Sequence, residues 1–571
     1  MDLKPVYNIA EICAQLGVTE AILSPGSRCA PLTVAFARHK DIRCRTITDE
    51  RSAAFIGMGI AQKTKRPTVL VCTSGSAAYN YAPAIAEAYF QQIPLIVITA
   101  DRPPEWIDQL DGQTIRQQNI YGQHIKKSYQ LPVDLENENS EWHAYRTVSE
   151  AVNLANQLPF GPVHLNIPFR EPFYPAPGEE AEYDTNIKVT NHVKSITDLP
   201  HIEWVRISEE WKKFKRILIV GGQDYANEAL KAPLSKIIKD QKIPVVGDII
   251  SNLHGIEDVI KRSDLFLGQD KPGLHESMQP ELLVTFGKST ISKNLKLLLR
   301  KYKPLEHWHI QPSGYVADTY QSLSKVIPVN PVTFFKKIAE REHQESFGNQ
   351  KQENFFYIWQ IEERKAQRQT NTFFPYESWG EFECIKETIQ QLPAGSHLHL
   401  ANSMAVRYAN YAGLEKPDVE VFANRGTSGI DGSNSTTVGH CLSSDHLNIL
   451  ITGDLAFFYD RNAFWHNYKM PNLRILLLNN HAGGIFRIIN GPSKLPELEE
   501  FFETKQQLNA KLLAQEYGFE YLNCDKKTKF KNYLKSFLED DGIPKIMEIE
   551  TNSATNTEIL KTFKQTYKDL K

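Results

Sequence analysis

The chain has few cysteines and no long apolar run, and each absence narrows the kind of protein it can be. Its seven cysteines are odd in number and form no CxxC pair within 571 residues, which favours a reduced, cytoplasmic protein over a disulfide-stapled one. The longest apolar stretches, such as residues 475–478, are far too short to span a bilayer. Because the N-terminus shows no apolar run behind basic residues, we do not expect a signal peptide.

An excess of charge of either sign is also missing. The 65 lysines and arginines against 68 aspartates and glutamates leave a formal net charge of −3, so nothing points to a nucleic acid or a membrane as partner. With 41% apolar and 23% charged residues, the composition is that of a globular protein. A length of 571 residues is too great for one core and predicts about three domains of ordinary size.

Two stretches far apart in the chain share one pattern of strands and helices. Predicted strands at 68–72 and 94–98 enclose a helical stretch, and predicted strands at 447–451 and 473–478 enclose another that should reach about Tyr468. Each pattern is typical of a βαβ unit in a parallel sheet that is covered on both faces. The similar spacing indicates a weak internal duplication of an α/β domain, although any two βαβ units look alike.

A third α/β segment lies between the two copies. Apolar runs that end in glycine turns, at 216–222, 243–248 and 282–287, predict further strands. No GxGxxG motif opens a helix in this segment, so we expect a structural domain rather than a dinucleotide-binding one.

The stretch 336–372 is rich in charged and amide residues and predicts an exposed helix between the middle and last domains. We therefore expect domain boundaries near residues 185 and 350. They divide the chain into domains 1–185, 186–350 and 351–571.

The strongest chemical signal is Gly453-Asp454 followed by Asn479-Asn480. Each pair comes directly after a predicted strand, so both should lie at the carboxyl edge of a parallel sheet, where α/β proteins bind ligands. A carboxylate, an amide oxygen and a backbone carbonyl form the oxygen set that Mg²⁺ prefers when a diphosphate completes its octahedron. Each dipeptide alone is an ordinary turn, whereas the combination predicts a site for Mg²⁺ and a diphosphate.

This spacing is similar to the Gly-Asp…Asn-Asn signature of thiamine-diphosphate enzymes. The resemblance implies a carboxylate from the other copy of the fold, which hydrogen-bonds the aminopyrimidine ring and promotes the imino tautomer that removes the thiazolium C2 proton. Glu50 matches that position, because it follows the apolar step at Ile47 and opens a helix of small residues. The alternative is a first-turn carboxylate that the helix dipole favours by about 0.3–1 kcal/mol.

Four further segments look like one family, the 2-succinyl-5-enolpyruvyl-6-hydroxy-3-cyclohexene-1-carboxylate (SEPHCHC) synthases of menaquinone biosynthesis. They are residues 24–28, 99–104, 424–432 and 483–486. The resemblance runs from about residue 20 to about residue 490 and is thin in the middle segment. It implies a transferase with three doubly wound α/β domains of the thiamine-diphosphate enzyme type, named pyrimidine-binding, central and diphosphate-binding.

The family also implies a reaction and an assembly. Its members decarboxylate 2-oxoglutarate on the cofactor, release CO₂ and add the succinyl-semialdehyde carbanion to isochorismate in a Stetter-like 1,4-addition. The active sites lie between the first domain of one subunit and the last domain of its partner, which requires a homodimer or homotetramer.

The resemblance further implies thiamine diphosphate and Mg²⁺ or Mn²⁺ as cofactors. It assigns the metal to Asp454, Asn480 and the backbone carbonyl of Ala482. The cofactor-binding residues that it implies are Glu50, Ser428, Gly429, Ile430, Gly453, Asp454, Leu455, Asn480, Ala482, Gly483, Ile485 and Phe486.

Each of the two substrates carries two carboxylates, so the pocket should hold several guanidinium or ammonium groups. Ser403 and Arg407 are four residues apart, which places both on one face of a helix after a strand at 397–400. The motif-matched candidates are Ser27, Arg28, Arg102, Gln113, Lys293, Ser403, Arg407 and Arg425.

Several positions depart from the family pattern, among them Cys29, which stands where a small hydroxyl residue is common. Asn294 follows Lys293 where a second basic residue is usual, which leaves the carboxylate contacts of that loop open. His481-Ala482 replaces the usual Asn/Asp-Gly after Asn480, but a backbone carbonyl at Ala482 can still bind the metal.

Two histidine pairs, His307/His309 and His397/His399, have a spacing that zinc sites can use. Neither pair has a cysteine or acidic third ligand in an obvious pattern, so we expect hydrogen-bonded or surface histidines.

Two other functions stay open at this point. An acetolactate-synthase-like carboligase would usually need FAD in the central domain and accept uncharged pyruvate-derived groups, and the set of arginines argues against it. A non-catalytic binding protein could keep the fold, but loss of Glu50 or Asp454 would be expected, and both are present.

Overall fold

The computed structural model describes residues 3–569 except 172, 177, 194, 342–349, 375–378 and 490. The chain forms two compact units. Unit 1 consists of Met1–Lys194, Asn424–Asp445 and Ala456–Leu473, and unit 2 of Ser195–Ala423, His446–Leu455 and Arg474–Lys571. The boundaries predicted near residues 185 and 350 stay predictions, because these units group the chain differently.

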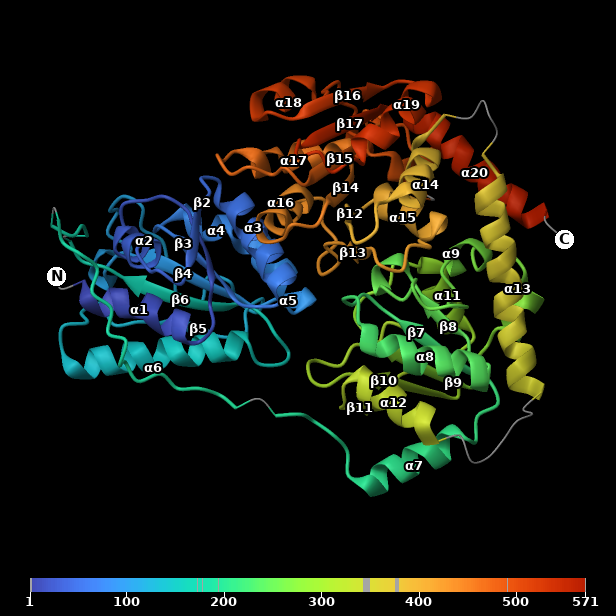
Figure 1. Ribbon diagram of the computed structural model, residues 1–571, viewed down its shortest axis with the longest axis horizontal. Coiled ribbons are helices and arrows are strands. Elements are labelled where there is room, and N and C mark those ends of the chain that lie inside the picture. The colour runs from blue at the N-terminus through green and yellow to red at the C-terminus, as the bar shows by residue number, and fades with distance from the viewer. Residues whose placement is uncertain are drawn as a thin grey trace. The chain divides into compact units, whose positions relative to one another are not determined.

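A six-stranded parallel sheet forms the core of unit 1, in the order β2-β1-β3-β4-β6-β5 (Figure 1). Its strands β3 and β4 are buried along their whole length, as expected for apolar runs covered on both faces. The strands are β1 Glu20–Leu23, β2 Arg43–Thr46, β3 Thr68–Cys72, β4 Leu95–Asp101, β5 Ser128–Gln130 and β6 Val163–Pro168. The helices of this unit are α1 Lys4–Gln15, α2 Ala30–Ala37, α3 Glu50–Thr64, α4 Ser76–Asn80, α5 Ala82–Gln91, α6 Glu138–Ala155 and α16 Ser433–Ser443.

The last sheet, in unit 2, repeats the strand order of the first. Its order is β13-β12-β14-β15-β17-β16, so second, first, third, fourth, sixth and fifth strand follow one another in both sheets. This shared strand order supports the predicted internal duplication. The strands are β12 His397–Leu400, β13 Glu420–Phe422, β14 Asn448–Gly453, β15 Leu473–Asn479, β16 Glu520–Cys524 and β17 Lys545–Glu550. The helices around it are α13 Gln350–Thr372, α14 Glu381–Gln391, α15 Met404–Ala412, α18 Lys511–Tyr517, α19 Lys527–Phe537 and α20 Ser553–Asp569. Helix α17 Asp454–Tyr459 begins in unit 2 and continues into unit 1.

A third parallel sheet, also in unit 2, has the order β11-β10-β9-β7-β8, which is a doubly wound arrangement. Trp204, Trp211 and Trp308 pack in its core. Its strands are β7 Ile217–Gly221, β8 Val245–Gly247, β9 Leu282–Phe286, β10 Glu306–Ile310 and β11 Lys325–Ile327. Its helices are α7 His201–Trp211, α8 Glu228–Gln241, α9 Ser263–Phe266, α10 Pro272–Ser277, α11 Lys293–Lys301 and α12 Pro331–Arg341. Three parallel α/β sheets confirm the predicted fold class.

Two local predictions need correction. The helix expected to reach Tyr468 ends at Tyr459, because Asp460 accepts hydrogen bonds from the backbone N–H and the hydroxyl of Ser435, both at 2.7 Å, and turns the chain. The stretch 336–372, of which 342–349 lie outside the described residues, is helical in α13 but not fully exposed. Trp359 is buried and its ring lies 5.9 Å from that of Phe266, because one face of α13 packs on the rest of unit 2.

None of the helices in the described ranges combines the length and apolarity needed to cross a bilayer.

Within unit 1, helix α3 packs very closely on helix α16. A Cβ atom built on Gly59 would lie 2.2 Å from the carbonyl oxygen of Thr436, and one built on Gly439 would lie 2.2 Å from that of Ile56. Both neighbours are backbone atoms, which cannot move aside as a flexible side chain can. The contact therefore requires glycine on both helices, and it brings together segments that are far apart in the sequence.

We expect Gly439→Ala to lower the free energy of unfolding by about 1–3 kcal/mol, the usual cost of overpacking. Chemical denaturation measures this difference. Gly273→Ala is the matched control, because a Cβ at Gly273 in α10 would meet no atom within 4 Å. A Gly439→Ala protein as stable as the wild type would show that the two helices do not approach this closely.

Candidate functional site

The carboxyl edge of the last sheet gathers several polar groups in unit 2. Asp454 directly follows β14 and Asn480 directly follows β15, and these two strands are neighbours. The strand order reverses between β12 and β14. The connections that follow these two strands therefore run to opposite faces of the sheet. Such a switch point is where doubly wound sheets bind ligands.

The carboxylate of Asp454 is buried, with 2% of the residue exposed. Its Oδ2 accepts a hydrogen bond from Nε2 of Gln506 at 2.7 Å. Burial raises the pKa of Asp454 to about 6, and the hydrogen bond from Gln506 opposes this rise. The side-chain donor is a neutral amide rather than a lysine or arginine, so a bound cation would stabilise the ionised carboxylate.

Asn480 is held by a second buried carboxylate, Glu381, the first residue of α14. Nδ2 of Asn480 donates to Oε1 of Glu381 at 2.6 Å, while Oδ1 of Asn480 accepts from the backbone N–H of Ala482 at 3.1 Å. Burial raises the pKa of Glu381 to about 7, and the nearby Asp454 carboxylate adds to this rise. No sequence motif drew attention to Glu381.

These groups fit a divalent cation and a diphosphate. The carboxylate of Asp454, the amide oxygen of Asn480 and the carbonyl of Ala482 are all hard oxygen donors, as Mg²⁺ requires. A Cβ built on Gly453 would meet no atom within 4 Å, so open space lies beside the turn that carries Asp454.

His481 and Ala482, which stand in place of the usual Asn/Asp-Gly, form the turn after Asn480. His481 has φ +59°, in the left-handed region where histidine is enriched among non-glycine residues. Its Nε2 lies 2.8 Å from Oε2 of Glu550, which fixes the ring. Beyond the turn, the candidates Gly483, Ile485 and Phe486 lie at or in a short 3₁₀ helix at 484–487, and the ring of Phe486 lies 5.7 Å from that of Phe502.

Three candidate substrate residues lie on unit 2. Ser403 precedes α15 with φ +71°, and its carbonyl accepts a hydrogen bond from Nη1 of Arg407 at 2.5 Å. Lys293 opens α11, on the third sheet. Asp264 joins the two helices, because it accepts from Tyr411 Oη of α15 at 2.9 Å and from the hydroxyl of Ser292, the N-cap of α11, at 2.6 Å.

The same aspartate explains the departure at Asn294. The Asn294 backbone N–H donates to Oδ1 of Asp264 at 3.1 Å, and its Nδ2 donates to the Asp264 carbonyl at 2.9 Å. Asn294 therefore binds the start of α11 to Asp264. A cation that sequence motifs missed comes from α20, where Nζ of Lys564 lies 5.2 Å from the centre of the Tyr411 ring. Burial lowers the pKa of Lys564, which Asp264 opposes and Arg407 reinforces.

Leu455 follows Asp454 at the start of α17 in unit 2, and the remaining candidates lie on unit 1. Glu50 is the first residue of α3, and Nδ2 of Asn80 lies 3.4 Å from its Oε2. Its neighbours Asp49 and Arg51 bind the segment 459–462: Asn462 Nδ2 donates to Asp49 at 2.7 Å, and Arg51 donates to the Tyr459 carbonyl at 2.8 Å.

Two candidate arginines of unit 1 are engaged within their own domain. Arg28 is buried, donates to the Phe169 carbonyl at 2.8 Å and lies over the Phe173 ring at 4.3 Å. Arg102 donates to the Gly112 carbonyl at 2.9 Å and pairs with Asp111 at 3.4 Å. The neighbouring candidates Ser27 and Gln113 are exposed.

Glu87 of α5 anchors the loop that carries the longest motif match. Its carboxylate accepts from the N–H groups of Gly426 at 2.7 Å and Thr427 at 2.6 Å, and from the Thr427 hydroxyl at 2.6 Å. The candidates Arg425, Ser428, Gly429 and Ile430 flank these two residues, so one buried carboxylate holds the backbone between them.

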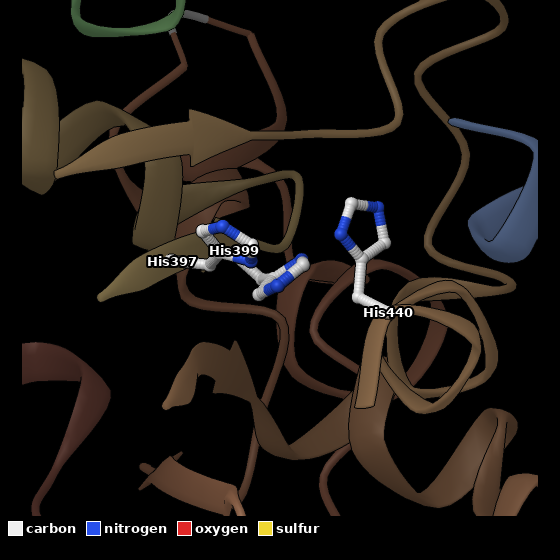
Figure 2. A group of neighbouring side chains, drawn as sticks. All are labelled: His397, His399 and His440. Atoms are coloured by element: carbon white, nitrogen blue, oxygen red, sulfur yellow. The ribbon is translucent and has the colours of Figure 1, made fainter. Parts of the chain in front are cut away.

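The histidine pairs are hydrogen-bonded, as predicted. His397 and His399 on β12 lie 3.3 and 2.9 Å from Oδ1 of Asn448, and His307 and His309 share Oγ1 of Thr285 at 2.9 and 2.8 Å. Figure 2 shows the first pair together with His440, a residue of α16 in unit 1.

Comparison with known proteins adds independent findings. Residues 7–125 match the family described as thiamine pyrophosphate enzyme, N-terminal TPP binding domain. The chain is 48% identical over 567 residues to a 2-succinyl-5-enolpyruvyl-6-hydroxy-3-cyclohexene-1-carboxylate synthase of Cytophaga hutchinsonii, covering 99% of each chain. It is 39% identical to the synthase of that name from Flavobacterium johnsoniae, over 97% of each chain. It is 35% identical to that of Porphyromonas gingivalis, over 98% of this chain and 97% of the relative.

We expect Glu87→Ala to loosen the loop 425–430. Hydrogen bonds to a charged group are worth about 1.5–3 kcal/mol each, so the amide hydrogens of Gly426 and Thr427 should exchange at least about tenfold faster. Hydrogen-exchange mass spectrometry of peptides covering the loop measures this. Glu87→Gln keeps one acceptor oxygen and should be intermediate, with exchange in α6 unchanged in both variants. Unchanged exchange of the loop in Glu87→Ala would contradict the anchoring role.

Proposed function

The chain belongs to the family of SEPHCHC synthases, and we propose that it joins 2-oxoglutarate to isochorismate with release of CO₂, as a step of menaquinone biosynthesis. The observation that carries this proposal is the 48% identity over 99% of both chains with a synthase of that name. The match of residues 7–125 to a thiamine-pyrophosphate enzyme family makes it a thiamine-diphosphate enzyme. The seven free cysteines support a cytoplasmic location.

We propose that Asp454, Asn480 and the Ala482 carbonyl hold Mg²⁺ or Mn²⁺, and that the metal holds the diphosphate. The oxygen chemistry of these groups and the burial of Asp454 support this role. Residues beside these ligands would contact the cofactor, namely Gly453, Leu455, Gly483, Ile485 and Phe486. Ser428, Gly429 and Ile430 of the loop 425–430 are also proposed to contact it. When bound, thiamine diphosphate supplies the electron sink for loss of CO₂ and for carbon–carbon bond formation.

Glu50 would move the proton that activates the cofactor. Its carboxyl group would hold a proton toward the ring nitrogen of a bound aminopyrimidine, which would favour the imino form of that ring. The position of Glu50 at the start of α3, between two residues that are each fixed to the segment 459–462, supports a fixed carboxylate. General acid–base catalysis of this kind typically contributes about 10²–10⁴-fold.

The cationic candidates would orient the two dicarboxylic substrates. Arginine pairs with carboxylates through two parallel hydrogen bonds, which fixes the substrate's direction as well as its position. Burial lowers the pKa of the Arg407 guanidinium, which marks it as a desolvated cation that gains from an anionic partner. Ser27, Arg28, Arg102, Gln113, Lys293, Ser403 and Arg425 are the other residues proposed for this role.

The function is tested by product formation with components omitted in turn. Mass spectrometry should detect the SEPHCHC product only when thiamine diphosphate, a divalent metal, 2-oxoglutarate and isochorismate are all present. Arg407→Ala should impair use of the substrates by about 2–5 kcal/mol, the usual cost of truncating one partner of a desolvated pair, while cofactor affinity stays unchanged. Product formed without thiamine diphosphate, or none with all components, would refute the proposal.

We also propose a homo-oligomer whose active sites join two subunits, so that Glu50 and Asp454 serve one cofactor from different chains. Glu50→Gln and Asp454→Ala proteins should each be inactive alone, because the first cannot move the proton and the second cannot bind the metal. After mixing and subunit exchange, heterodimers should regain one intact site in two. Persistent inactivity after verified exchange would place each site within one chain.

A further inference from the structure

We infer that Glu381 is a positioning residue: its carboxylate holds the side-chain amide of Asn480 in the orientation that directs Oδ1 to the metal. This inference rests on the proposed function, which assigns Asn480 to the metal. It concerns a residue of α14 that belongs to none of the motifs and lies 99 residues before Asn480 in the sequence.

The argument begins with the two ends of the amide. An asparagine side chain carries a donor, NH₂, and an acceptor, the oxygen, and only the oxygen can bind a metal ion. Nδ2 of Asn480 lies 2.6 Å from Oε1 of Glu381, a short hydrogen bond of the kind that an ionised acceptor favours. A carboxylate accepts but does not donate, so it selects the amide orientation with nitrogen toward α14.

The oxygen of Asn480 then points to the side where the other proposed ligands lie. Oδ1 is 3.1 Å from the backbone nitrogen of Ala482, within the turn whose Ala482 carbonyl is a proposed ligand. The Asp454 carboxylate is close enough to Glu381 to raise the pKa of that group. A flipped amide would place NH₂ in the metal site and oxygen against a carboxylate, and both contacts would be repulsive.

Glu381 is itself fixed from several elements. Its backbone N–H donates to Oδ1 of Asn556 in α20 at 3.1 Å, and Nδ2 of Asn556 donates to Thr551 Oγ1 at 3.0 Å. A Cβ on the preceding Gly380 would lie 2.7 Å from the Ile559 side chain, so the start of α14 sits tightly on α20. Only 1% of Glu381 is exposed. A carboxylate held in this way can impose an orientation on its partner.

A buried carboxylate at this position is otherwise unfavourable. Desolvation raises its pKa, and the neighbouring Asp454 repels its charge. The start of a helix compensates part of this cost through the helix dipole. Groups that orient metal ligands from behind typically contribute about 10–100-fold to metal affinity, which accounts for a carboxylate here in place of an apolar side chain.

The test compares two replacements of similar length in the full-length protein. Glu381→Gln keeps an acceptor oxygen for Asn480, whereas Glu381→Met fills the space without one. Mg²⁺ is titrated calorimetrically into metal-stripped protein with saturating thiamine diphosphate, and unfolding is followed separately. We expect Glu381→Met to bind Mg²⁺ about 10–100-fold more weakly. Glu381→Gln keeps an acceptor but can also donate, so it should be intermediate between Glu381→Met and the wild type. Glu387→Ala, on the same helix beside Lys386, is the control and should not change the affinity.

Two outcomes would overturn the inference. The first is wild-type Mg²⁺ affinity in Glu381→Met, whatever its stability, which would leave Glu381 as an anchor of α14 only. The second is equal weakening by Gln and Met, which would show that the charge rather than the acceptor matters. Asp454→Ala separates these results from failure of the proposed function: if it too binds Mg²⁺ normally, the metal site itself is assigned wrongly.

Discussion

The burial of the Asp454 carboxylate determines which groups the edge of the last sheet must bring together. A residue with 2% exposure has lost most of its hydration, and the Gln506 amide together with backbone N–H donors compensates only part of that loss. Under the proposed function, one cation supplies the rest and is shared with the groups that follow β15. These groups are distant in the sequence, and they meet because neighbouring parallel strands end at the same edge of the sheet.

Strands were predictable where an apolar run carries its own turn signals. The strands predicted at 68–72 and 397–400 coincide with β3 and β12. Helix ends were less predictable, because they depend on distant partners. The helix after Asp454 stops where Asp460 binds Ser435, 25 residues earlier, and α13 is half-buried because the rest of unit 2 covers one of its faces. Local composition contains neither contact.

The sequence predicted which residue types form the candidate site, but it did not predict the hydrogen bonds that hold them. The Asp454 and Asn480 positions followed from strand ends, and the structure brings both to one edge. Glu381 and Lys564 could not be found in this way, because each is a common residue on an amphipathic helix and acquires its role from tertiary contacts. Asn294 was a departure in the sequence, and its bonds to Asp264 give it a structural role.

The glycine contact between α3 and α16 acts as a pivot for the carboxylate at the start of α3. Glu50 opens this helix and Gly59 lies in its third turn, roughly 13 Å away along a rigid rod. A tilt of about 10° at the pivot would carry Glu50 through about 2 Å, by the geometry of such a rod. Catalytic geometry is sensitive to displacements of about 1 Å. Under the proposed function, two residues without side chains, Gly59 and Gly439, therefore set the accuracy with which Glu50 delivers the proton.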